Sequence, residues 1–182
     1  MTRLVFFFIC TLLFLWFSRR SLTNPNSHGF YRFFVFEGIL VIVLLNHPYW
    51  FDNPFSPLHL LSWFLLLSSI VFVGYSLLLL RRLGGHANRE EMPENLKFEN
   101  TARIVDEGIY RVIRHPMYTS LLFLGWGAFL KHTTPLTALI ITLVSILLII
   151  VAKVEERENV AFFGNAYRDY IKRTWMFVPW LL

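Results

Sequence analysis

Five apolar stretches separated by short polar segments dominate the chain. They run over residues 4–17, 30–45, 58–80, 117–130 and 135–152. A helix needs roughly 20 apolar residues to cross about 30 Å of hydrocarbon, so the third stretch and, nearly, the fifth are long enough. The first and fourth are short, and we expect them to borrow flanking residues, thin the bilayer or pack within a helical hairpin. The pattern predicts an all-α, polytopic membrane protein with about five transmembrane helices.

Two boundaries of these stretches carry local signals. Pro135 follows the polar residues 131–134, which predicts a tight hairpin between the fourth and fifth segments. The first stretch has only Arg3 before it, lacks a small-residue cleavage site and is followed by Arg19 and Arg20. These features favour a membrane helix over a cleaved signal peptide, with its N-terminus outside the cytoplasm.

The composition agrees with a lipid environment. The 182 residues are 55% hydrophobic and only 16% charged, whereas a soluble domain carries about a quarter charged residues. The length suits a single domain, residues 1–182. The single cysteine, Cys10, excludes an internal disulfide or a cysteine-built metal site. His47 and His59 fit interfacial polar residues better than metal ligands, so we expect no metal.

The net charge of +5 raises nucleic acid as a partner, but the basic residues flank the apolar segments. That placement indicates contact with the bilayer and its anionic head groups, not with nucleic acid. If the N-terminus lies outside, all but Arg3 and Lys131 of the 17 basic residues fall on the inner side. We therefore expect an integral protein of the cell inner membrane with a cytoplasmic C-terminus. Function is expected on this side, in segments 81–115 and 153–182.

A polar, aromatic cluster precedes the fourth stretch. Pro116 suits the first position of a helix, which predicts that His115 lies near its N-cap. His115 and Tyr118 would then share one helical face. The amides of this helix start, with Arg111 and Arg114, would attract a carboxylate or phosphate. The alternative is a basic, aromatic belt at the membrane interface.

A second cluster, Glu155 and Glu156, directly follows the fifth stretch. At the C-terminal end of a helix these acids would oppose the helix dipole and lie beside anionic lipid. Residues that break local rules are candidates for function. The structural alternative is a salt bridge to Arg114, Lys153 or Arg157. Both clusters are predicted on one side of the membrane, where they would suit a ligand with a cation, a carboxylate and a flat ring, such as S-adenosylmethionine.

Two further segments are polar or amphipathic. Residues 155–170 contain Val160, Phe162, Phe163, Tyr167 and Tyr170 among charged residues, which predicts an amphipathic surface helix interrupted at Gly164. Residues 84–100 form a polar loop with the charge run Arg89-Glu90-Glu91, which is expected to be solvated. The first of these segments would anchor the chain on the membrane or close over a ligand.

Four motifs occur in a characteristic order: Gly108-Ile-Tyr110, Arg114-His-Pro-Met-Tyr118, Glu155-Glu156 and Phe163-Gly164-Asn-Ala-Tyr167. In this they resemble the isoprenylcysteine carboxyl methyltransferase family, integral membrane enzymes related to the phospholipid N-methyltransferases. The resemblance covers residues 83–179 and is most specific in the Arg-His-Pro-x-Tyr and Glu-Glu combination. The first three apolar stretches match in hydropathy alone.

The resemblance implies an enclosed S-adenosylmethionine site near the cytoplasmic face, walled by the last two membrane helices and the C-terminal segment. A lipophilic acceptor would enter sideways from the bilayer. For an amine acceptor, His115 and Glu156 would be the nearest proton acceptors, and no catalytic residue is assigned. By motif position, the cofactor-binding residues would be Ala102, Arg103, Ile104, Val105, Tyr110, His115, Pro116, Met117, Tyr118 and Glu155.

The chain departs from the resembled family at one position. Family members that methylate prenylated cysteine carry an arginine four residues before the first glutamate, where this chain has Val151. Arg103, Arg111 or Lys153 are possible substitutes. The sequence therefore leaves three classes of methyl acceptor: a carboxylate, an amine or a thiol. The acceptor group can belong to a phospholipid or to another small molecule. Two other interpretations are an NADPH-dependent membrane reductase and a non-catalytic membrane subunit.

Overall fold

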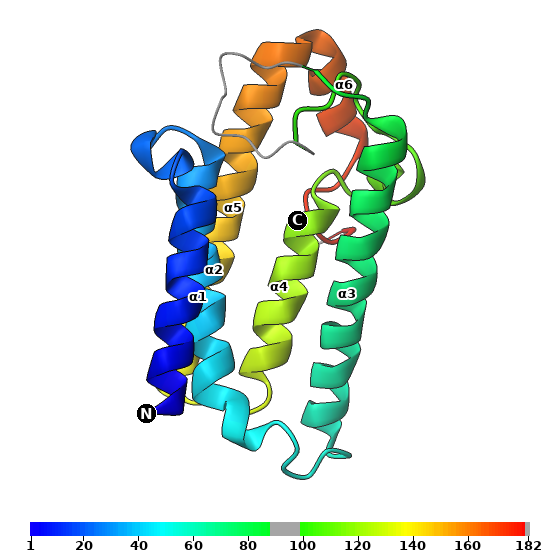
Figure 1. The fold of residues 1–182 in the computed structure, drawn as a ribbon. Helices are drawn as coiled ribbons and strands as arrows, with labels where there is room; N and C mark the ends of the chain where they lie inside the picture. Colours follow the sequence, from blue (N-terminus) through cyan, green and yellow to red (C-terminus); the bar gives the residue numbers. More distant parts are fainter. Residues whose placement is uncertain (88–98, 181–182) are drawn as a thin grey trace.

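The computed structural model describes residues 1–87 and 99–180 as a bundle of helices (Figure 1). The charge run Arg89-Glu90-Glu91 lies outside the described residues. The α-helices are α1 (Thr2–Ser18), α2 (His28–Asn46), α3 (Pro57–Leu83), α4 (Pro116–Phe129), α5 (Pro135–Phe163) and α6 (Asn165–Arg173). Short 3-10 helices occur at η1 (Ser21–Thr23), η2 (His47–Tyr49) and η3 (Gly108–Arg111).

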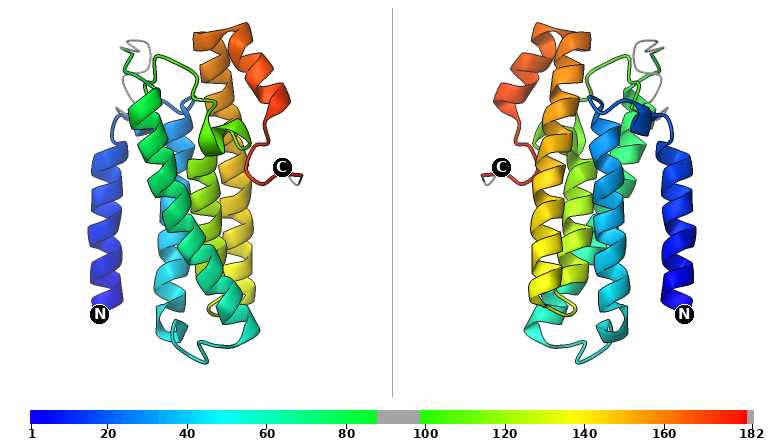
Figure 2. Two further views of the ribbon diagram at one scale, coloured as in Figure 1. Left: turned by 90° about the vertical axis from the view of Figure 1, so that its right-hand side faces the viewer. Right: turned by 90° about the vertical axis from the view of Figure 1, so that its left-hand side faces the viewer.

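The first five α-helices run up and down side by side, and α6 folds back at one end (Figure 2). Helices α2, α3 and α5 are long and apolar enough to cross a membrane, with α2 continuing to Tyr49, and α1 is a shorter apolar helix. Helix α4 is shorter still, at 14 residues. The prediction of an all-α, polytopic membrane fold is confirmed. Five helices form on the five predicted apolar stretches.

The short helix α4 ends against side chains of its neighbours. The last carbonyls of a helix lack partners within the helix, and leaving them unpaired in hydrocarbon costs several kcal/mol. Amides of the following turn bond some of these carbonyls, and side-chain donors come from Asn46 of α2 and His59 and Ser62 of α3, here called the distal cap. Their acceptors are the carbonyls of Ala128, Lys131 and Gly127, at 2.9, 3.0 and 2.6 Å respectively. The cap lets α4 end early, and it assigns His59 a buried structural role that its sequence context did not show.

The turn between α4 and α5 is tight, as predicted. Thr134 and Thr137 form a capping box at the start of α5, with Pro135 at the first helical position. Lys131 in this turn is buried, and its Nζ lies 3.4 Å from the centroid of the Trp63 ring. Burial lowers the pKa of Lys131. The turn lies at the end of the bundle opposite α6 (Figure 1), and His59 of the distal cap bonds its Lys131 carbonyl there.

The core forms where α2 packs antiparallel against α5, with α4 beside them. Gly38 permits close approach, because a Cβ there would lie 2.5 Å from Cγ2 of Val144. Val151 is fully buried in this core, as its apolar surroundings predicted. The close packing of α2 on α5 fixes how far along the bundle axis the side chains of the two helices lie. It therefore positions the residues that both helices contribute to the cavity described below.

Helix α1 lies at the edge of the bundle, against α2 (Figure 2). Most of its large apolar side chains are exposed, and Ser18 is its one buried residue. A 3.0 Å hydrogen bond from Thr11 Oγ1 to Glu37 Oε2 joins α1 to α2. An exposed apolar surface of this kind suits contact with lipid.

The predicted end of the fifth helix is wrong. Helix α5 continues about two turns beyond Glu156, to Phe163, so the two glutamates lie inside the helix and do not oppose its dipole at the terminus. The helix persists because its acids find partners, Glu156 with Arg114 and Glu158 with His28. The predicted break at Gly164 is confirmed, with φ at +63° between α5 and α6.

Candidate functional site

The start of α4 is held in place by the C-terminal segment. His115 is the N-cap and Pro116 the first helical residue, as predicted. The amides of Arg114 and His115 donate to the carbonyls of Trp175 and Met176, at 2.9 and 3.2 Å. Deeper in α4, Thr119 Oγ1 lies 2.9 Å from the carbonyl oxygen of Phe177. Residues 174–177 therefore position the predicted motif, a role that local sequence pattern does not reveal.

A cavity of about 300 Å³ opens beside this helix start, which is within the range of small-molecule sites. Eight of the ten predicted cofactor-binding residues line it, namely Ile104, Val105, Tyr110, His115, Pro116, Met117, Tyr118 and Glu155. Ala102 and Arg103 do not line it. Their amides donate to the Gly84 carbonyl and both residues are exposed, so this part of the connecting segment passes over the end of α3.

Aromatic rings form one wall of the cavity. The His115 and Tyr118 rings stack with centroids 5.5 Å apart, which confirms that they share a face. Tyr110, Tyr167 and Tyr170 complete the wall. Burial raises the pKa of the Tyr110, Tyr167 and Tyr170 hydroxyls above the usual range, so all three stay neutral. The wall thus offers ring faces and neutral hydroxyl groups.

Glycine is required at Gly108, where η3 begins. Its φ is +55°, and a Cβ there would lie 2.6 Å from the Tyr75 hydroxyl oxygen and 2.9 Å from Leu79. This close approach to α3 places Tyr110 in the cavity. Tyr170 Oη donates to the Tyr110 carbonyl at 2.6 Å and ties η3 to α6.

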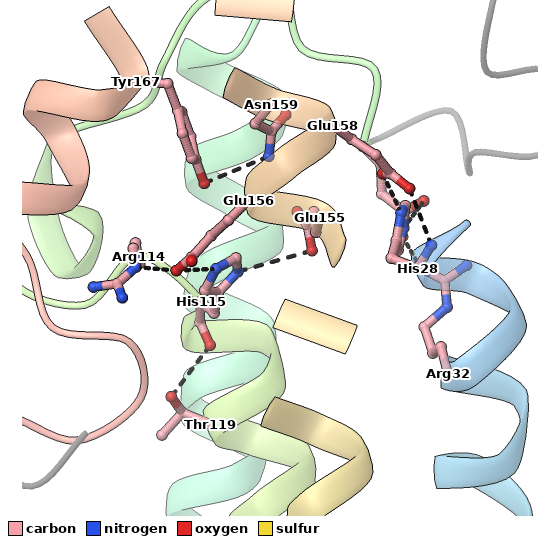
Figure 3. A network of polar contacts seen from close by, with 11 residues as sticks. His28, Arg32, Arg114, His115, Thr119, Glu155, Glu156, Glu158, Asn159 and Tyr167 are labelled. Carbon is pink, nitrogen blue, oxygen red and sulfur yellow. Dashed lines mark hydrogen bonds and ion pairs between the residues drawn. The ribbon is translucent and has the colours of Figure 1, made fainter. Parts of the chain in front are cut away.

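The two adjacent glutamates both lie near His115, at 3.8 Å from Glu155 and 3.5 Å from Glu156, but their other contacts differ (Figure 3). Glu156 is buried, with Arg114 Nε 2.5 Å and Lys153 Nζ 2.9 Å from its carboxylate oxygens. For this residue the structural alternative, a salt bridge, is correct. Glu156 is not among the residues that line the cavity, and its candidacy as a proton acceptor stays a prediction. Its carboxylate is committed to holding Arg114 and the start of α4.

Glu155 lines the cavity and is 24% exposed. Within the described residues, its closest basic nitrogen is His115 Nδ1, at 3.8 Å. The Tyr118 hydroxyl is also a hydrogen-bond partner of this carboxylate. Because no lysine or arginine of the described residues lies within salt-bridge distance of Glu155, its negative charge is available there to a cationic group in the cavity.

A second polar network joins α2 to α5 at the same end of the bundle. His28 donates its amide to Glu158 at 3.0 Å, and its Nδ1 lies 2.6 Å from the same carboxylate. Its Nε2 lies 3.4 Å from Glu99, which also pairs with Arg32. Arg32 and Glu99 both line the cavity, although α2 lies outside the motifs.

Sequence reasoning missed several residues of the lining. Phe163 and Tyr167 belong to a motif and could have been found from it. For the others, hydropathy gave no signal, since Arg32 resembles any basic residue beside an apolar stretch. The missed lining residues are Arg32, Phe36, Val73, Leu80, Glu99, Thr101, Ser120, Leu121, Asn159, Phe163, Tyr167 and Tyr170. The described residues contain no group of three or more His, Cys, Asp or Glu side chains that could hold a metal ion.

The chain matches known proteins over the region of this cavity. The sequence model of the phospholipid methyltransferase family matches residues 71–166, which include α4 and most of the cavity motifs. No solved structure matches the chain.

Its curated relatives include several methanethiol S-methyltransferases. That of Crocosphaera subtropica is 25% identical over 173 residues, or 89% of this chain and 64% of the relative. That of Pseudomonas deceptionensis is 34% identical over 39% of the chain and 26% of the relative. Methanethiol S-methyltransferase 2 of Bradyrhizobium diazoefficiens is 37% identical over 39% of the chain and 27% of the relative. The chain thus spans less than two thirds of the length of these relatives.

The family match extends over more than half of the 182 residues and includes both the Arg-His-Pro-Met-Tyr and the Glu-Glu motifs. The resemblance seen in the sequence, to membrane methyltransferases related to those that act on phospholipids, is therefore confirmed. The chain belongs to the phospholipid methyltransferase family.

Proposed function

We propose that this chain transfers a methyl group from S-adenosylmethionine to a small, largely apolar acceptor. One observation carries the proposal: Glu155 presents a carboxylate, without a lysine or arginine partner among the described residues, to a cavity walled by aromatic rings. A sulfonium or amino cation and an adenine ring match these two features. Family membership supports the choice of methyl transfer.

The lining residues fit such a donor. Glu155 would hold one of its cationic groups, and the rings of His115, Tyr118 and Tyr110 would pack against its flat or positively charged parts. The bound donor supplies an already activated methyl group. The protein's own contribution is then alignment and exclusion of water, because in-line transfer depends mainly on these two effects. The enclosed wall made by η3, α4 and α6 suits that role.

A thiol is the acceptor class that the relatives favour, since those reported above are named as methanethiol S-methyltransferases. A thiolate or a carboxylate needs no general base at the moment of transfer. An amine would have to lose a proton, and His115 is the candidate that lines the cavity. We therefore place a thiol ahead of an amine, and a phospholipid amine remains the second candidate because of the family match.

We further propose that the cavity faces the cytoplasm. Arg19 and Arg20 follow α1, and Arg81 and Arg82 end α3, all at the cavity end of the bundle. Lys131 lies at the opposite end, in the turn between α4 and α5. An excess of basic residues marks the cytoplasmic side of membrane proteins.

The test is methyl transfer by the purified protein in lipid nanodiscs. Tritiated S-adenosylmethionine is supplied with methanethiol, hexanoate or a lipid extract, and labelled products are separated and counted. We expect label in the thiol ether, lost in His115→Ala and Glu155→Ala. A parallel titration with NADPH addresses the reductase interpretation. NADPH binding without any methyl transfer would overturn the proposed function.

A further inference from the structure

Two arginines of the described part of the chain, Arg32 and Arg114, line the cavity, and their N–H groups are used differently. Arg114 has committed donors, with Nε 2.5 Å from Glu156 and Nη1 2.5 Å from the Thr174 carbonyl. Arg32 pairs through Nη1 with Glu99. Its Nε is buried and has no hydrogen-bond partner among the described residues. A buried donor without a partner destabilises the folded protein, and a hydrogen-bond acceptor on a ligand would remove that cost.

The packing of α2 on α5 fixes the height of Arg32. His28 bonds Glu158, and Gly38 abuts Val144 further along the antiparallel pair. Counted from these two anchor points along the antiparallel pair, Arg32 lies level with residues 150–154 of α5, a range that includes Val151. Val151 is the position where the chain lacks an arginine, so Arg32 brings a guanidinium to the same height from the neighbouring helix.

The substitutes suggested by the sequence do not reach the cavity. Arg103 and Arg111 are exposed, and Lys153 is 51% exposed and bound to Glu156. None of the three lines the cavity. These possible substitutes for the missing arginine therefore lie away from the cavity, whereas Arg32, among the described residues, is a cation of its lining with a buried N–H that has no partner.

The walls near Arg32 are apolar. Phe36, one turn along α2, lines the same cavity, together with Val73 of α3 and Leu121 of α4. Glu155 and Tyr118, which belong to the proposed side of the methyl donor, line the same cavity as Arg32. The cavity thus pairs a carboxylate on its α5 side with a guanidinium and apolar walls on its α2 side.

We propose that Arg32 binds the reacting end of the methyl acceptor and that this end is an anion, a thiolate or carboxylate on an apolar chain. The inference rests on the proposed function. In the transfer, a lone pair of the acceptor anion forms the new bond to the methyl carbon while the carbon–sulfonium bond breaks and leaves its electron pair on sulfur. A cation and an anion become two neutral groups, so no proton or further reactant is needed. Arg32 orients the anion, and the apolar walls hold its chain.

The experiment uses wild-type protein, Arg32→Gln, Arg32→Lys and the control Arg82→Gln in nanodiscs. Arg82 is an exposed arginine at the same end of the bundle. Calorimetric titrations first measure the affinity of each protein for S-adenosylmethionine. Hexanoate and hexylamine, an anion and a cation of equal length, are then titrated with and without saturating S-adenosylhomocysteine, and empty nanodiscs give the background.

We expect Arg32→Gln to keep its affinity for S-adenosylmethionine within about threefold and to lose at least about tenfold in hexanoate affinity, the loss of one charged hydrogen bond. Hexylamine binding should not fall, Arg32→Lys should retain part of the hexanoate affinity, and Arg82→Gln should match wild type. The assignment would be overturned if Arg32→Gln lost affinity for hexanoate and hexylamine equally. It would also be overturned if the variant lost affinity for S-adenosylmethionine alone. If wild-type protein did not bind S-adenosylmethionine, the proposed function would be refuted. The hexanoate titrations without S-adenosylhomocysteine would still decide whether Arg32 binds the anion.

Discussion

The two ends of the helix bundle use their buried polar side chains in different ways. At the distal end, Asn46, His59 and Ser62 spend their hydrogen bonds on backbone carbonyls at the end of α4. At the cavity end, Glu155 and Arg32 keep part of their capacity unused within the described structure. Polar groups in a membrane bundle thus serve either the fold or a ligand, and their partners distinguish the two roles.

The adjacent residues Glu155 and Glu156 show the same difference within one helical turn. Glu156 is buried and paired with Arg114 and Lys153, whereas Glu155 faces the cavity. We therefore expect Glu156 to be needed mainly for the stability of the fold and Glu155 mainly for ligand binding.

The largest effect is expected from Glu156→Ala. Removing this carboxylate leaves the Arg114 guanidinium buried without its partner, which costs about 3–5 kcal/mol in the free energy of unfolding. Denaturation with sodium dodecyl sulfate in mixed micelles measures it. Glu155→Gln is the matched control and should stay near wild-type stability. Equal destabilisation by both variants would break the comparison.

Asn46→Ala should have the next largest effect. Asn46 is 1% exposed and donates to the carbonyls of Ala128 and Phe129, so its loss should cost about 1–3 kcal/mol. Affinity for S-adenosylmethionine, measured by calorimetry, should not change. The exposed neighbour His47→Ala serves as the control. A loss of donor affinity with unchanged stability would contradict a purely structural role of the distal cap.

Ser62→Ala tests the weakest member of the distal cap. Its hydroxyl donates a single bond, 2.6 Å long, to the Gly127 carbonyl. Interhelical bonds of this kind average about 0.6 kcal/mol in a membrane protein, so a change of that size in the same denaturation assay is expected. A cost above that of Asn46→Ala would show that the order of the cap residues is wrong.

Much of the fold follows from hydropathy, because lipid makes long apolar runs into helices. The five apolar helices and the turn before Pro135 were predicted correctly on this basis. The end of α5 was not, since Glu155 and Glu156 look like a boundary until their distant partners are known. Tertiary packing brings Arg114 next to Glu156 and places Glu155 at the cavity, so neither environment can be seen in the local sequence.

The candidate site was predictable where it is local in sequence. His115 to Tyr118 form one helical turn, so their grouping follows from helix geometry. Arg32 was not predictable, because it reaches the cavity only through the packing of α2 on α5. The distal cap was missed for a similar reason, since its acceptors are backbone carbonyls that exist at that place only once α4 ends there.

The central claim is that the cavity binds S-adenosylmethionine through Glu155. Isothermal titration of the protein in nanodiscs with this ligand tests it most directly, with Glu155→Gln and Asn46→Ala measured alongside. The account predicts wild-type affinity in roughly the micromolar range, weakened at least about tenfold in Glu155→Gln and unchanged in Asn46→Ala. No binding by wild type, or equal affinity in Glu155→Gln, would contradict it.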